Sequence, residues 1–359
     1  IALWVGLVVI SREHRPRFTP LVVAILAFTA IVGLADLFGI NPYNSFWSRY
    51  ERMEGYVTIL HLAAYFLMLG SVFRTKGEWR LLFTTFLGVG VATGFYGILQ
   101  KLGYLASIQG GIRIDGTIGN PTYLAAYLLL LLVLALTLFV ESTSRLWRWI
   151  YGLTAAYFVF IILLTASRGP ILGLILGTIL GAALYLIFVR DADPAVRLRR
   201  KIALGILAAA VIIPAGFWAV RSSDFARSNY IFERFANLSF TEKTTRSRFM
   251  IWAMSWEGFK ERPVLGWGQE NYTTVFAKYF NPKLYDQEPW FDRSHNIVFD
   301  WLINAGLLGL VAYLALFVAA IRALYQALRR RAIDARVGVV LCAGLVAYFF
   351  QNLFVFDNF

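Results

Sequence analysis

The chain has 359 residues, of which 59% are hydrophobic and only 15% are charged, with a formal net charge of +13. A mean hydropathy of +0.63 excludes an ordinary soluble domain and predicts an all-α polytopic membrane protein. In such a protein an excess of Lys and Arg reports membrane topology rather than nucleic-acid binding. The single cysteine, Cys342, excludes an intrachain disulfide and a cysteine-based metal site.

A transmembrane helix needs about 20 apolar residues, and the chain offers ten such stretches. They lie near 1–10, 20–40, 56–73, 81–100, 121–140, 149–166, 169–189, 202–220, 296–321 and 337–356. Because the chain starts at Ile1 without a methionine, we expect the first stretch to be cut and a full chain to hold up to 12 spans. The predicted organisation is a bundle over 1–220, an outer helical segment over 221–294 and two further spans over 295–359.

The connections between these spans differ sharply in positive charge. Successive connections lie on opposite sides of the membrane. Those on one side hold 18 Lys and Arg, whereas the short connections on the other side hold 5. By the positive-inside rule the first set faces the cytoplasm. The long segment 221–294 holds the other 11, together with nine acids, and therefore lies on the outer, periplasmic side.

The outer segment contains two predicted helices and a turn. Apolar residues at near-helical spacing over 225–240 predict an amphipathic helix at the membrane surface. A second helix follows from a cap at Thr244 or Thr245 to about Pro263. The stretch 264–272 is a predicted glycine-rich turn and 281–290 a predicted loop.

His295 stands where the outer segment meets the ninth span, in the stretch FDRSHNIVFDWLINAGLLG. It either caps the start of the helix or serves as a general base, since only imidazole changes charge near neutral pH. Asn296 is a candidate to orient the imidazole, and Asp292 and Arg293 are expected at the rim of a cavity. Gly306 and Gly309 are expected to let the ninth helix pack closely.

Arginines on the outer face form the second candidate group. Arg168, in SRGP, stands at the tip of a tight predicted hairpin and either reaches the lipid headgroups or binds an anion. Arg246 and Arg248 lie in the first turns of the second outer helix, and Arg248 shares a face with Trp252. Guanidinium groups near the positive end of a helix dipole suit an anion such as a pyrophosphate, without a metal or another cofactor.

Four motifs in order resemble the bacterial O-antigen ligase and polymerase superfamily, which includes the O-linked oligosaccharyltransferases. They are SRG at a span boundary, RFMIW, RPVLGWGQENY and SHNIVFDWLINAGLLGL, within residues 160–315. The resemblance implies a GT-C-like, metal-independent glycosyltransferase of the inner membrane. Its donor would be a glycan on undecaprenyl pyrophosphate, with Arg168 and Arg248 on the pyrophosphate and His295 assisting the acceptor. Arg246, one turn position away from the motif, is a further candidate for the pyrophosphate.

The acceptor is left open by the sequence. A ligase would use a lipid A core sugar in lipopolysaccharide biosynthesis, a polymerase a second lipid-linked glycan, and a protein O-glycosylase a Ser or Thr side chain. The compact outer segment favours the ligase. A different class, a flippase or transporter of the same lipid-linked glycan, would bind the pyrophosphate without chemistry. Transporters often show repeated halves and broken helices near the middle of the membrane, and the sequence shows neither.

Overall fold

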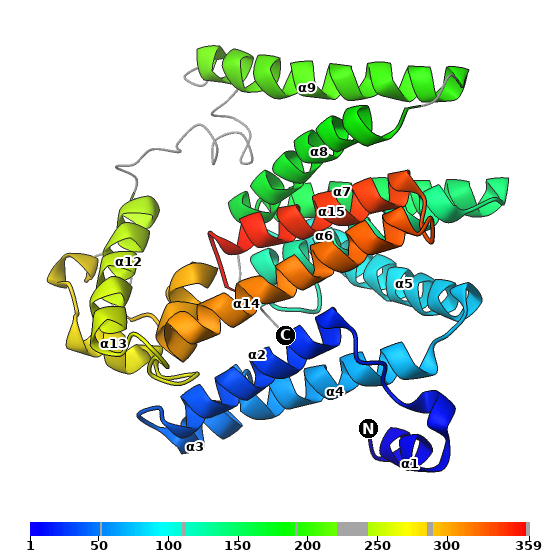
Figure 1. Cartoon of the computed structure of the whole chain (residues 1–359). Coiled ribbons are helices and arrows are strands. Elements are labelled where there is room, and N and C mark those ends of the chain that lie inside the picture. The colour runs from blue at the N-terminus through cyan, green and yellow to red at the C-terminus, as the bar shows by residue number, and fades with distance from the viewer. Residues whose placement is uncertain (51, 110–112, 191–192, 221–242, 286–289, 357–359) are drawn as a thin grey trace. The chain divides into compact units, whose positions relative to one another are not determined.

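The computed structural model describes residues 1–50, 52–109, 113–190, 193–220, 243–285 and 290–356, and these ranges are helical without a strand. The chain is therefore an all-α protein, as predicted (Figure 1). Its longer helices are α1 (Ala2–Ile10), α2 (Pro20–Leu37), α4 (Tyr56–Val72), α5 (Lys76–Lys101), α6 (Pro121–Glu141), α7 (Arg145–Leu164), α8 (Arg168–Phe188), α9 (Pro194–Val220), α12 (Lys243–Glu261), α14 (Ile297–Arg329) and α15 (Ala335–Asn352).

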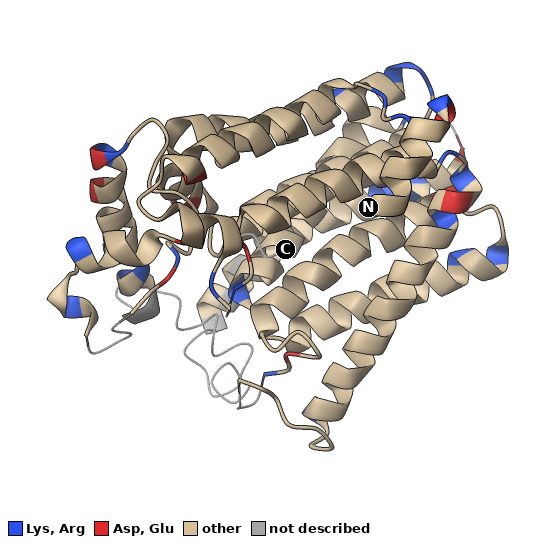
Figure 2. Ribbon diagram, turned by 90° about the horizontal axis from the view of Figure 1, so that it is seen from below, with Lys and Arg blue, Asp and Glu red and all other residues tan. Residues whose placement is uncertain are grey.

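Seven of the described helices are long and apolar enough to cross a membrane, namely α2, α5, α6, α7, α8, α14 and α15. Each coincides with a predicted span, which confirms a polytopic membrane protein. α4 is a shorter apolar helix, and α1 and α9 are helices at the positions of the other two predicted spans. Figure 2 shows that charged residues gather at helix ends and in connections. The middles of the long helices carry almost none.

Several helices start at a cap followed by proline. The Thr19 hydroxyl accepts from the backbone N–H of Val22 at 3.2 Å, and Pro20 opens α2. The Asn120 side chain likewise accepts from the N–H of Thr122 at 2.8 Å before α6. Such caps satisfy backbone donors that have no intrahelical partner, and proline fits the first helical position because it lacks an N–H.

The described part of the outer segment contains the second predicted helix, α12, and the predicted turn. The turn holds Gly266 and Gly268 at φ +69° and +85°, the left-handed region that glycine adopts without steric cost. Short helices α3 (Pro42–Trp47) and α13 (Tyr272–Lys278) and the 3₁₀ turns Arg12–His14 and Pro282–Leu284 were not predicted. The amphipathic helix expected at 225–240 lies outside the described residues.

The chain forms two compact units, each made of segments far apart in sequence. The first contains Ile1–Trp79, Ser239–Ala323 and Asn352–Phe359, and the second contains Arg80–Leu238 and Leu324–Gln351. The first has an apolar core around Ile251, Val275 and Ile303, which are fully buried. The core of the second is built largely from α6 and α7, with Leu124 and Phe158 fully buried.

Candidate functional site

His295 precedes α14 in an uncommon backbone conformation, with φ at +53°. Few residues other than glycine adopt this region, and those that do often mark a functional site. The imidazole lies between the rings of Phe291 and Phe356, with ring centroids 5.5 and 5.3 Å away. Its Nδ1 is buried and has no hydrogen-bond partner among the described residues. The Nδ1 atom of His295 is thus buried between two aromatic rings and is left to hydrogen-bond with a ligand.

Arg248 lies beside His295, as a shared site requires. Its Nη1 donates to the backbone carbonyl of His295 at 3.3 Å and also to the carbonyl of Phe354. One turn further along α12, the Trp252 indole N–H donates to the carbonyl of Ser294 at 3.1 Å. One face of α12 is therefore fixed to the residues that precede α14. Arg246 is exposed and makes no hydrogen bond or ion pair within the described ranges.

The electrostatic surroundings keep the His295 side chain neutral. Burial, reinforced by the positive charge of Arg248, lowers the pKa of His295 to about 3. Without a bound anion the imidazole is therefore uncharged throughout the physiological pH range. It can accept a proton or a hydrogen bond, and the positive charge of the site belongs to Arg248.

Asn296 caps α14 instead of facing the imidazole. Its side-chain oxygen accepts from the N–H groups of Val298 and Phe299 at 2.9 and 3.3 Å. Its amide nitrogen donates to the carbonyl of Leu353 at 3.0 Å. Both ends of the amide are engaged with backbone, so Asn296 positions His295 through the main chain.

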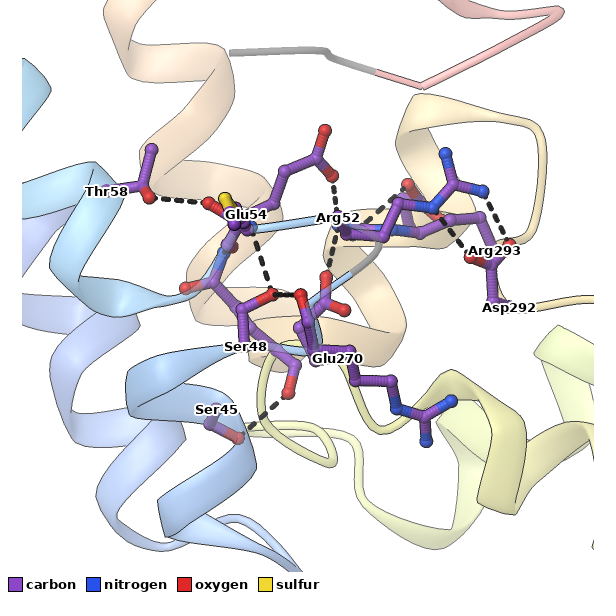
Figure 3. A network of polar contacts seen from close by, with 12 residues as sticks. Ser45, Ser48, Arg52, Glu54, Thr58, Glu270, Asp292 and Arg293 are labelled. Carbon is purple, nitrogen blue, oxygen red and sulfur yellow. Dashed lines mark hydrogen bonds and ion pairs between the residues drawn. The ribbon is translucent and has the colours of Figure 1, made fainter.

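Arg293 is the centre of a buried ionic node, shown in Figure 3. Its guanidinium contacts Glu54 at 2.5 Å and Glu270 at 2.7 Å, with Asp300 at 3.8 Å. The residue is 6% exposed, so the expectation that Arg293 lies at a cavity rim is wrong. A guanidinium among three carboxylates is stable inside the protein only because it is paired, and pairing draws it inward.

The carboxylates of this node outnumber its guanidinium. Burial, together with the negative charge of Glu270, raises the pKa of Glu54 to about 7, although Arg293 opposes the shift. A proton on Glu54 relieves the excess of negative charge near neutral pH. Next to the node, Arg52 makes a two-pronged pair with Asp292 at 2.7 and 2.9 Å. Both of these side chains are partly exposed.

Three segments far apart in sequence meet at this node. Arg52 and Glu54 precede α4, Glu270 belongs to the glycine-rich turn, and Asp292 and Arg293 precede α14. Sequence reasoning missed Arg52, Glu54 and Glu270. The charged stretch RYERMEG, on the side that holds few Lys and Arg, was the available signal.

A break in α14 accommodates the glycine-rich turn. Ala305 and Gly306 depart from helical geometry, and Gly306 has φ +63° and ψ −160°. The opened carbonyls of Ile303 and Asn304 accept from the N–H groups of Trp267 and Gly268 at 2.7 and 3.1 Å. The N–H of Leu307 donates to the carbonyl of Pro263 at 2.8 Å. The turn thus replaces helical hydrogen bonds that the break removes. Gly306 is required for the break rather than for close helix packing.

Arg168 belongs to the second unit, at the first position of α8. α7 ends at Leu164 and α8 begins at Arg168, which confirms the tight hairpin. Arg113 holds this corner, because its Nε donates to the carbonyl of Thr165 at 2.9 Å and its Nη2 to the hydroxyl of Ser167 at 2.8 Å. Two guanidinium groups therefore stand at the positive end of one helix, a favourable place for an anion.

Within the described ranges, no group of three or more His, Cys, Asp or Glu side chains is arranged to hold a metal ion.

Comparison with known proteins identifies the central part of the chain. Residues 153–314 match the family model described as O-antigen ligase. A search of curated proteins finds no match. The matched range includes Arg168, Arg248 and His295, and it agrees with the range over which the motifs show their resemblance. The match confirms, over residues 153–314, the resemblance to the O-antigen ligase family that the motifs indicate.

Proposed function

We propose that this membrane protein transfers a glycan from undecaprenyl pyrophosphate to a sugar of the lipid A core, on the periplasmic face of the inner membrane. The observation that carries the proposal is the pairing of Arg248 with His295, 3.3 Å apart through the His295 carbonyl, inside the segment that matches O-antigen ligases. The pair supplies a fixed positive charge and a neutral proton acceptor. Transfer from a pyrophosphate needs both.

In this proposal the arginines bind the leaving group. Arg248 and Arg168 engage the pyrophosphate oxygens, and the exposed Arg246 is a further candidate to contact them. A guanidinium binds phosphate oxygens through two parallel hydrogen bonds and stabilises the charge that develops as the sugar–oxygen bond breaks. The electron pair of that bond stays on the pyrophosphate. No metal ion is required for this step.

His295 takes the proton of the acceptor. The acceptor hydroxyl attacks the anomeric carbon from the face opposite the pyrophosphate, which inverts that centre, and its proton passes to the imidazole. A base whose pKa is about 3 is weak. Pyrophosphate at Arg248 would offset one of the causes that lower this pKa. His295 should therefore be a stronger base with the donor bound than without it.

The test is transfer by the purified protein, with a lipid-pyrophosphate glycan as donor and EDTA present. We expect turnover with EDTA, at least a hundredfold loss in Arg248→Ala, and a comparable loss in His295→Gln with donor binding retained. Lys260→Ala is the matched control, because Lys260 lies on the same helix, exposed and paired with Glu257. Loss of turnover on chelation, or near-normal turnover in Arg248→Ala, would refute the proposed chemistry.

A panel of acceptors decides the reaction class. Transfer to lipid A core supports the ligase, whereas transfer to a second lipid-linked glycan or to a protein hydroxyl would replace the ligase with a polymerase or an O-glycosylase. Movement of the donor across vesicles without transfer to any acceptor would indicate a flippase. It would overturn the enzymatic proposal.

A further inference from the structure

A cavity of about 380 Å³ lies among α6, α7, α8, α9 and α15, and all of its lining residues belong to the second unit. Its walls are mostly apolar and include Phe139 of α6, Ile206 of α9 and Val340 of α15. The volume falls in the range of pockets that bind small molecules, about 300–1,000 Å³. Neither Arg113 nor Arg168 lines it, so it is separate from the anion site at the start of α8.

Three arginines line the same cavity: Arg148, Arg199 and Arg336. Arg148 is held over the turn between α6 and α7, where its Nη2 donates to the carbonyl of Ser142 at 2.7 Å. Arg336 pairs with Asp334 at 2.8 Å. Arg148 and Arg199 are exposed and have no carboxylate partner within the described residues. The apolar walls therefore carry a net positive charge.

A buried hydroxyl adds a directional contact. Tyr185 lines the cavity, and its Oη is buried without a hydrogen-bond partner among the described residues. A buried polar atom without a partner costs free energy, which a bound acceptor group would recover. The three arginines belong to the connections that the Lys and Arg distribution assigns to the cytoplasm.

We propose that this cavity binds an anionic glycerophospholipid of the cytoplasmic leaflet. One acyl chain occupies the apolar part, the phosphate contacts the guanidinium groups of Arg148 and Arg199, and the Tyr185 hydroxyl donates to an ester carbonyl. Basic pockets between transmembrane helices on the cytoplasmic side suit such headgroups. A neutral ligand would leave Arg148 and Arg199 without a counter-ion, and a free phosphate would leave the apolar walls unfilled.

The first experiment compares headgroups on the delipidated full-length protein. Phosphatidylglycerol and phosphatidylcholine with the same acyl chains are titrated at low salt, and binding is followed by native mass spectrometry. We expect tighter binding of phosphatidylglycerol, weakening as salt rises. Equal binding of the two lipids, or displacement of phosphatidylglycerol by millimolar glycerol phosphate, would overturn the proposal.

Matched variants then locate the site. Each arginine near an anionic headgroup contributes about 1 kcal/mol, so Arg148→Gln with Arg199→Gln should weaken phosphatidylglycerol binding roughly thirtyfold. The control is Arg145→Gln with Arg197→Gln, on the same two helices and outside the cavity lining. Equal effects of the two double variants would place the lipid elsewhere.

A substitution that fills the cavity tests its apolar part without changing its charge. Ile206→Trp fills the cavity and should weaken binding of both lipids, while Leu204→Trp, on the same helix but outside the lining, should not. Tyr185→Phe should weaken phosphatidylglycerol binding about twofold to tenfold, as the loss of one hydrogen bond does. If Ile206→Trp binds like Leu204→Trp, the acyl chain does not enter this cavity.

Discussion

Removal of the Arg293 charge is the sharpest test of the buried node. Arg293→Met keeps most of the side-chain volume but leaves Glu54, Glu270 and Asp300 without their shared guanidinium. Breaking a buried pair by removing one partner costs about 3–5 kcal/mol, because the remaining charge stays desolvated. We expect a loss of this size in the free energy of unfolding, together with loss of transfer, because the neighbouring His295 shifts.

The matched control is Arg52→Met, which breaks the adjacent pair with Asp292. That pair is partly exposed, at 23% and 20%, so its loss should cost about 1 kcal/mol or less. Unfolding in detergent, followed by tryptophan fluorescence, measures both variants. Equal stabilities for Arg293→Met and Arg52→Met would refute the claim that burial makes this node strong.

The deficit of Arg293→Met should also depend on pH. The pKa of Glu54 is raised in the folded protein, to about 7 from 4.5, so the folded state holds a proton that the unfolded state releases. Stability is therefore lost as pH rises from 4.5 through 7. The charge of Arg293 lowers the pKa of Glu54, so without Arg293 this pKa rises further. The deficit should be larger at pH 8 than at pH 5, and a constant deficit would contradict an electrostatic cause.

Three further predictions follow from individual contacts. Gly306→Ala should lower the free energy of unfolding by about 3 kcal/mol or more, because the Gly306 backbone conformation is essentially restricted to glycine and a Cβ would overlap the Val264 carbonyl. The control is Gly70→Ala, where a Cβ meets nothing within 4 Å and no destabilisation is expected. Arg248→Gln should raise the pKa of His295, followed by NMR in a protein without His14 and His61, because the Arg248 charge lowers it; an unchanged titration would contradict a contribution from Arg248. Arg113→Lys should raise the donor KM about tenfold, because it removes the fork that holds the Arg168 hairpin; an unchanged KM would contradict that positioning role.

Local sequence features predicted the helices well. Seven predicted spans, α12 and the turn around Gly266 and Gly268 follow from apolar length, caps and glycine, which act over a few residues. The SRGP hairpin followed in the same way, since two apolar runs separated by so few residues leave room only for a turn. The prediction that Arg248 and His295 serve one site rested instead on the resemblance of the motifs.

The ionic node could not be predicted from local features. Glu54 and Arg293 are separated by 239 positions, and a charged residue in a connection is usually solvated. Nothing near Arg293 in the sequence distinguishes a rim residue from one that is paired inside the protein. The break in α14 was missed for a related reason, because glycine inside an apolar helix usually serves close packing. Its true role depends on the partner turn, 263–268, which is distant in sequence.

A reason for an ionic node at this position follows from the backbone it holds. Apolar packing tolerates small shifts, whereas directed polar contacts allow one arrangement. The Arg293 guanidinium contacts Glu54 and Glu270. The Asp300 carboxylate accepts from both the backbone N–H and the hydroxyl of Ser294. Ser294 and Asn296 on either side of His295 are thus fixed by hydrogen bonds, which holds the left-handed conformation that places the imidazole beside Arg248. Replacing Glu270 by Gln keeps the volume and a hydrogen-bond acceptor but removes a charge. If the node holds the geometry of the site as well as stabilising the fold, Glu270→Gln should lower the turnover per folded molecule, whatever it does to the free energy of unfolding. A variant that loses stability but keeps its turnover per folded molecule would refute this role.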